Sequence, residues 1–140
     1  MPMANGGYWR TKADWQRVEA PLLRIDPVLD AFCREHRLRI TKNLKDWPER
    51  SLVWGDSIRL LIQVYLTDPQ QLTFNVWLCA SQDRGDERYW KHEMPVRGLP
   101  VEAFENDFAA LLRDAKARLE SWSEADFEFA TPLTRTPDAE

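Results

Sequence analysis

Residues 58–80, IRLLIQVYLTDPQQLTFNVWLCA, decide the fold of this chain. Apolar residues occupy every second position over 58–66 and again over 72–80, which is the period of a β-strand with one buried face. The residues Asp-Pro-Gln at 68–70 separate the two runs and are typical of a turn. The segment therefore predicts an antiparallel pair of strands at the centre of the chain.

A helix is predicted before this hairpin, because apolar residues recur every three or four positions from Trp15 to His36. Asp26 and Pro27 suit the cap and the first turn of a helix, so we expect a fresh helix from there to about Arg37. The preceding segment is either a separate short helix or a kinked extension, since an interior proline costs about 3 kcal/mol.

A second helix is predicted after the sheet. It begins at Pro100 and carries an apolar stripe from Phe104 to Trp122. Acidic residues fall early and basic residues late in this segment, which complements the helix dipole. Residues 123–126 resemble a capped short turn of helix.

The register of the strand that follows residue 85 depends on the turn before it. We treat residues 83–85, Asp-Arg-Gly, as a three-residue loop with Gly85 in the left-handed conformation. This choice gives three cross-strand pairs: Leu78 with Trp90, Val76 with His92 and Phe74 with Met94. It sends Trp90 to the core, whereas a one-residue slip would bury Lys91 and Glu93.

Further strands are expected over 38–44 and around 52–54, with a tight turn at Gly55-Asp56. The predicted fold is α+β: a two-layer sandwich whose antiparallel meander sheet of about four strands is covered on one face by the N-terminal and C-terminal helices. We expect one domain over 11–130, a flexible N-terminus at 1–10 and a flexible tail at 131–140.

Composition narrows the class of protein. The net charge of −4 over 140 residues is too small to select a partner. The chain has only two cysteines and no apolar signal segment, and its longest apolar run is far shorter than a membrane span, so we expect a cytoplasmic protein without membrane contact. Arginine outnumbers lysine fourteen to five, which is typical of a GC-rich bacterial genome.

The face of the sheet that the helices leave open is the predicted binding surface. Aromatic rings interleaved with amides and an arginine are typical of interface cores, although an ordinary solvated face is the alternative. On the predicted register Lys91 lies across from Trp77, in reach of a cation–π contact. The candidate binding residues are Arg59, Gln63, Tyr65, Asn75, Trp77, Tyr89, Lys91 and Glu93.

The residues capable of chemistry do not assemble into a recognised site. Cys33 and His36 are spaced as half a metal site, but three or four ligands are required, so we expect no metal. Cys79 and His92 resemble a nucleophile and its base, yet the predicted register places them on opposite faces of the sheet. No cofactor motif is present, and the basic residues between 34 and 50 are interrupted by acids, which argues against a nucleic-acid partner.

We interpret the chain as a non-enzymatic protein-interaction or accessory module that uses the open aromatic face, with self-association as one form of that role. We nominate no catalytic residue. The alternative is a small-ligand-binding domain or an enzyme, with a site between sheet and helix lined by Phe74, Trp90 and His92.

Overall fold

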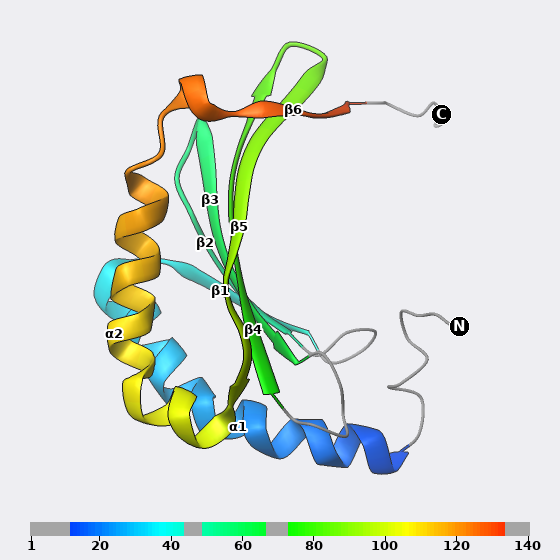
Figure 1. Ribbon diagram of the computed structural model, residues 1–140, viewed down its shortest axis with the longest axis vertical. Helices are drawn as coiled ribbons and strands as arrows, with labels where there is room; N and C mark the ends of the chain where they lie inside the picture. Colours follow the sequence, from blue (N-terminus) through cyan, green and yellow to red (C-terminus); the bar gives the residue numbers. More distant parts are fainter. Residues whose placement is uncertain (1–11, 44–48, 67–72, 134–140) are drawn as a thin grey trace.

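The computed structural model describes residues 12–43, 49–66 and 73–133. They form an α+β fold with one antiparallel sheet, in which the spatial order of the strands is their order along the chain (Figure 1). The elements are α1 (Lys12–His36), β1 (Arg39–Asn43), β2 (Glu49–Trp54), β3 (Ile58–Leu66), β4 (Thr73–Arg84), β5 (Glu87–Pro100), α2 (Val101–Glu120), a 3₁₀ helix (Glu124–Asp126) and β6 (Glu128–Pro132). The predicted antiparallel meander is confirmed, with six strands in the described part of the chain instead of about four.

The predicted alternation on β3 and β4 is confirmed. Ile62 pairs with Leu78, and Val64 pairs with Val76. All four side chains are fully buried, as expected for the apolar face of a half-covered sheet. The predicted turn at 68–70 lies outside the described residues.

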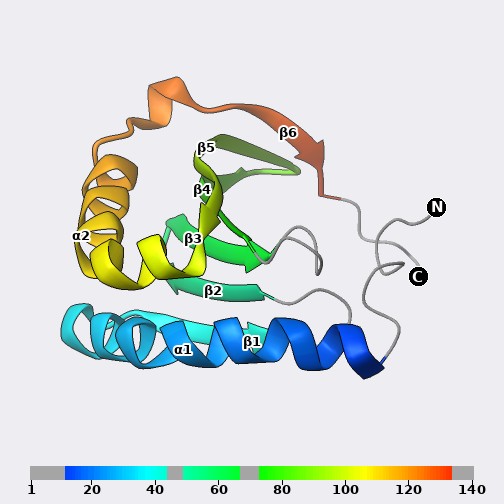
Figure 2. The ribbon, with the colours of Figure 1, turned by 60° about the horizontal axis from the view of Figure 1, so that its bottom comes forward.

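Both helices contribute to the one core that covers this face. Figure 2 shows α1 running beneath β1 and β2 while α2 lies beside β3 to β5. The buried helical side chains are Leu22, Ile25, Leu29, Phe32 and Cys33 from α1, and Phe108, Leu112, Ala115 and Leu119 from α2. The side chain of Phe104, at the start of the predicted stripe, lies outside the described part.

The end of the chain departs from the prediction. After α2, Ser123 accepts a hydrogen bond from the backbone N–H of Ala125 and caps the 3₁₀ helix, as expected. The chain then returns as β6 to pair with β5, so Thr131 and Pro132 belong to the sheet and not to a tail. Residues 1–10 and 134–140, which we predict to be flexible, lie outside the described residues.

The first helix is continuous through both prolines, so the predicted fresh start at Asp26 is wrong. Pro27 cannot donate to the carbonyl of Leu23, but Leu23 is 56% exposed, so water can satisfy that carbonyl. The helix ends where Arg37 adopts a left-handed φ of 62° and Leu38 N–H donates to the carbonyl of Cys33 at 2.9 Å.

Asp26 has a tertiary partner instead of a capping role. Its two carboxylate oxygens accept hydrogen bonds from Arg50 Nε at 2.7 Å and Arg50 Nη2 at 3.0 Å. Arg50 is 2% exposed and Asp26 is 8% exposed, so this ion pair is buried between α1 and β2. The basic residues between 34 and 50 therefore include one arginine that belongs to the core.

The β4–β5 hairpin has a different register from the one predicted. Its loop consists of two residues, Gly85 and Asp86. The φ of Gly85 is 62°, and glycine is favoured at the first position of a two-residue hairpin loop because it adopts a positive φ readily. The observed pairs include Leu78 with Glu93, Val76 with Val96 and Phe74 with Leu99, with register shifts between them. The predicted pairs with Trp90, His92 and Met94 are wrong.

No helix within the described ranges is long and apolar enough to cross a membrane.

Candidate functional site

The open sheet face, meaning the side of the sheet opposite α1 and α2, carries the candidate site. Cross-strand partners in an antiparallel sheet share a face. The register therefore places Gln63 beside Trp77, and it places Cys79 opposite His92. Figure 1 shows α2 on the other side of the sheet and α1 across its lower end, so no described helix covers this face.

Three rings form an aromatic cluster on the open sheet face. The ring centroids of Trp77 and Trp90 are 6.2 Å apart, and His92 lies 5.8 Å from Trp77 and 4.8 Å from Trp90. Trp77 Nε1–H donates to His92 Nδ1 at 3.4 Å. The contact orients the imidazole, and the edge-to-face geometry of the two indoles is a favourable arrangement of aromatic pairs.

A hollow of about 290 Å³, the apolar hollow, adjoins this cluster. Its walls include Leu61, Trp77, Cys79 and Trp90. A second hollow of about 450 Å³, the polar hollow, lies next to it and is lined by Asp56, Ser57, Gln82 and Asp83 among others. Arg59, Ser81 and Arg88 line both hollows, so the two are neighbours, and we call them together the depression, with an apolar end and a polar end.

The two arginines of this depression differ in whether a described carboxylate pairs with them. Arg88 donates to Asp83 from Nε at 2.7 Å and from Nη2 at 3.3 Å, and these hydrogen bonds lower the pKa of the Asp83 carboxyl. Arg59 is exposed and has no ion pair within residues 12–43, 49–66 and 73–133. Its guanidinium is therefore available to an anion that enters the depression.

Cys79 forms part of the wall of the apolar hollow. Burial raises the pKa of this thiol to about 11, and the nearby charges of Arg88 and Arg59 only partly oppose that effect. The prediction that Cys79 and His92 lie on opposite faces is wrong, since the two residues are direct cross-strand partners. The thiolate is the reactive form of cysteine, so a thiol that keeps its proton at neutral pH is a poor nucleophile.

We expect alkylation of Cys79 by iodoacetamide to be slow at pH 8 and to accelerate as the pH rises toward 11. Between pH 9 and pH 11 the folded thiol keeps its proton, whereas the thiol of the unfolded chain, with an ordinary pKa of 9.0, loses it. The free energy of unfolding therefore falls as the pH rises through this interval. Peptide mapping by mass spectrometry gives the rate at Cys79. Labelling at pH 8 that matches the rate of the chain unfolded in urea would contradict the buried, protonated thiol.

Five of the eight predicted binding residues belong to strand positions on the open sheet face: Arg59, Gln63, Tyr65, Asn75 and Trp77. Tyr65 donates its hydroxyl to Met94 Sδ at 3.5 Å. Asn75 is buried, and its Oδ1 accepts the backbone N–H of Gly98 at 2.8 Å, so this side chain holds the irregular part of β5.

The other three predicted residues, Tyr89, Lys91 and Glu93, lie on the helix side of the sheet. Tyr89 stacks edge-to-face on Phe129. The ammonium of Lys91 lies 5.1 Å from the ring of Trp122, not over Trp77. Placing these residues on the open sheet face was wrong, because the hairpin loop has two residues where we predict three.

Glu93 shows why the argument for the predicted register fails. A register that turns Lys91 and Glu93 toward the helices would be costly if it buried two unpaired charges. Arg118 on α2 instead donates to both carboxylate oxygens of Glu93 and lowers the pKa of its carboxyl. The side chains reach partners at the edge of the helical layer, so the register carries no such cost.

The predicted binding set omits five residues that line or adjoin the depression: Arg88, Trp90 and His92 of β5, which the predicted register places on the other face, and Cys79 and Ser81 of β4. The signal that would have placed the three β5 residues is the dipeptide Gly85-Asp86, read as a two-residue loop with glycine in its first position. That reading places Trp90 and His92 on the same face as Trp77 and Cys79.

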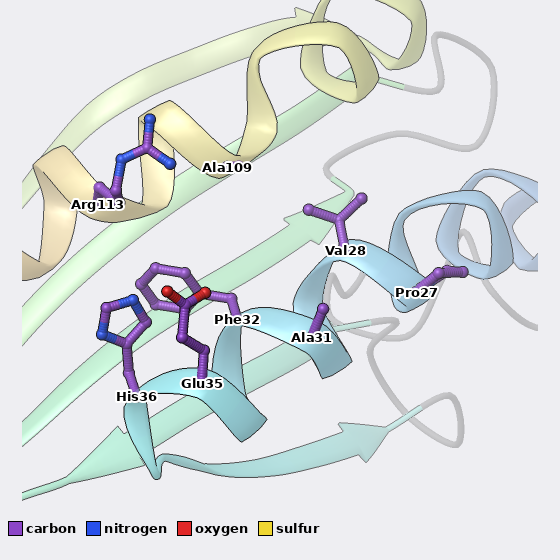
Figure 3. Close-up of a pocket in the computed structure, with 8 residues that line it drawn as sticks. All are labelled: Pro27, Val28, Ala31, Phe32, Glu35, His36, Ala109 and Arg113. Carbon is purple, nitrogen blue, oxygen red and sulfur yellow. The ribbon is translucent and has the colours of Figure 1, made fainter.

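A separate groove lies between the two helices (Figure 3). It measures about 350 Å³ and is largely apolar, with Glu35 contributed by α1 and Arg113 by α2. His36 packs on Phe32 with ring centroids 4.3 Å apart. The described residues contain no group of three or more His, Cys, Asp or Glu placed to hold a metal ion.

A fourth hollow, of about 200 Å³, lies between the sheet and α2, where the alternative function would place a ligand. Its lining is Leu78, Pro95, Val96, Leu111, Asp114, Ala115 and Arg118. The lining that we predict for such a site is wrong, because Trp90 and His92 lie on the open sheet face and Phe74 is fully buried in the core.

The chain matches no protein-family model, and it shows no significant similarity to a curated protein or to a solved structure.

Proposed function

We propose that this chain is a non-enzymatic binding domain whose open sheet face contacts a protein partner. The observation that supports this most directly is the depression beside the aromatic cluster, where Trp77 and Trp90 adjoin the exposed guanidinium of Arg59. Tryptophan and arginine are the residue types most enriched at the energetic centres of protein interfaces.

The chemistry of the open sheet face fits binding better than covalent catalysis. Cys79 is the thiol that lines the apolar hollow, and burial keeps it protonated. His92 accepts the indole N–H of Trp77 at Nδ1, so this ring nitrogen already has a hydrogen-bond partner. The groups that remain for a partner are flat apolar surfaces and a cation.

We further propose a cytoplasmic location. Cys33 lies in the helical core and Cys79 on the opposite face of the sheet, and both are free thiols. Free cysteines without a disulfide are typical of a reducing compartment.

A second copy of the chain is the first partner to test. We expect wild-type protein to self-associate as its concentration rises, and we expect Trp77→Arg to abolish that association by placing a charge in the apolar contact. Size-exclusion chromatography with light scattering over a concentration series measures both. Leu23→Arg is the matched control, because Leu23 is an exposed apolar residue on α1, away from the sheet.

Association that survives Trp77→Arg, or that is lost equally in Leu23→Arg, would contradict the open sheet face as the interface. If the wild type stays monomeric throughout, the self-associating form of the proposal is wrong. The face would then be tested by cross-linking in cells, where a specific partner must be lost in Trp77→Arg and retained in Leu23→Arg.

The alternative function, a small-ligand site between sheet and helix, depends on the hollow beside α2. Its walls are apolar side chains of both layers, and Asp114 and Arg118 stand among them. A ligand bound there would contact Leu111, so Leu111→Ala would weaken its binding, whereas Trp77→Arg would not.

A further inference from the structure

We propose that the depression on the open sheet face binds an extended segment of a partner protein in which an apolar side chain is followed directly by an acidic one. This inference rests on the proposed binding role of that face. It assigns the apolar side chain to the apolar hollow and the carboxylate to Arg59.

The apolar hollow sets the first requirement. At about 290 Å³, it is large enough for one ring-sized side chain, and Leu61, Trp77 and Trp90 are among its walls. Indole rings stack well on aromatic or aliphatic groups, so an apolar side chain gains contact area on more than one side.

Charge complementarity sets the second requirement. Arg59 and Arg88 line both hollows, and Arg88 already donates two hydrogen bonds to Asp83. Arg59 is exposed and lacks an ion pair among the described residues. A carboxylate adjacent to the buried apolar group therefore meets an exposed guanidinium that has no ion pair with the described residues, which favours acidic over neutral ligands.

The polar hollow distinguishes an extended segment from a compact organic acid. It continues the depression for about 450 Å³ beyond Arg59, and Ser57, Ser81 and Gln82 line it with hydroxyl and amide groups suited to a peptide backbone. Asp56 adds a negative charge there, which disfavours a second acidic residue at that end. A small acid that fills the apolar hollow would leave this longer part empty.

The test uses two capped peptides, acetyl-Phe-Asp-Ser-Ala-amide and acetyl-Phe-Asn-Ser-Ala-amide, titrated into the full chain by calorimetry and by NMR of the indole N–H signals. We expect the Asp peptide to bind about 1.5- to fivefold more tightly than the Asn peptide, the range for an exposed ion pair. Arg59→Gln should remove this difference. Arg39→Gln should not, because Arg39 is an exposed arginine on the edge strand β1 and lines neither hollow.

A second pair of probes distinguishes the carboxylate of a small organic acid from that of an acidic residue in a protein segment. N-acetylphenylalanine and its amide carry the same ring with and without the charge, but they have no further backbone. If the free acid binds as tightly as the Asp peptide, with the same dependence on Arg59, the ligand is a small organic acid and the inference of a protein segment is overturned. Equal binding of the Asp and Asn peptides, or equal loss in Arg39→Gln, would also overturn it.

The inference and the proposed function fail separately. Association that depends on Trp77 without any preference for the Asp peptide would leave the proposed function standing and refute the inference. A preference that depends on Arg59, in a chain whose partners are unaffected by Trp77→Arg, would show an acidic-peptide site on a face that is not the protein interface.

Discussion

Replacing Asp26 by alanine should lower the free energy of unfolding by about 3–5 kcal/mol, the cost of leaving one member of a buried ion pair without its partner. Arg50 is 2% exposed and would keep its charge, because a guanidinium does not lose its proton in proteins. In the folded chain its Nε and Nη2 donate to Asp26, and its Nη1 donates to the backbone carbonyl of Glu49. Urea unfolding followed by circular dichroism measures the difference as a shift of the midpoint.

Asp30→Asn is the matched control for this prediction. Asp30 lies one turn further along α1 and pairs with Lys42 at 3.1 Å, with both side chains more than a third exposed. Removal of this surface pair should cost no more than about 1 kcal/mol. If Asp26→Ala and Asp30→Asn have equal effects, the buried pair does not have the role that we assign to it.

A double variant separates the missing partner from the missing packing. Asp26→Leu combined with Arg50→Met removes both charges and keeps apolar bulk between α1 and β2. We expect it to recover much of the stability lost in Asp26→Ala, since apolar replacement of a whole buried pair is often neutral or stabilising. A double variant as unstable as the single one would point to lost packing as the cause.

Gly55→Ala should destabilise the chain by about 3 kcal/mol or more, because it combines two penalties. The φ of Gly55 is 95°, where residues with a Cβ are rarely found, and an added Cβ would lie 2.2 Å from the carbonyl oxygen of Ile58. That oxygen belongs to the backbone of β3, so relief of the contact requires a shift of the β2–β3 turn.

Gly85→Ala measures the cost of the left-handed backbone conformation without the steric contact. Its φ is 62°, but an added Cβ would meet no atom within 4 Å, so only the cost of the left-handed conformation remains, about 1–2 kcal/mol. Thermal unfolding of both variants should therefore rank Gly55→Ala well below Gly85→Ala. Equal midpoints would show that the β2–β3 turn yields to the methyl group without cost.

The central strands could be predicted because their two faces differ in chemistry. In β3 and β4 the apolar side chains alternate without a break, and a slip by one residue would expose every one of them. The stop of α1 near His36 and the start of α2 after Pro100 follow from equally local signals.

The candidate site could be predicted only in part, because its other half depends on a register with no such constraint. From Tyr89 to Glu93 both faces carry an aromatic residue next to polar or charged ones, so neither register is excluded by burial. A single residue of loop length then decides whether Trp90 joins Trp77 or enters the core. The partnership of Asp26 with Arg50 was equally beyond prediction, since the two residues are 24 positions apart and meet only after α1 docks on the sheet.

The order of strands in the sheet, identical to their order in the chain, has a consequence for synthesis on the ribosome. Each of the first four ladders joins neighbours in sequence, so each has low contact order and can close as soon as its second strand emerges. The side chains of Phe108 and Leu112 arrive only with α2, after β5 is complete. Until α2 arrives, α1 lies beneath β1 and β2, but the part of the apolar face that α2 covers is exposed, and exposed apolar surface of this kind makes a growing chain prone to aggregate.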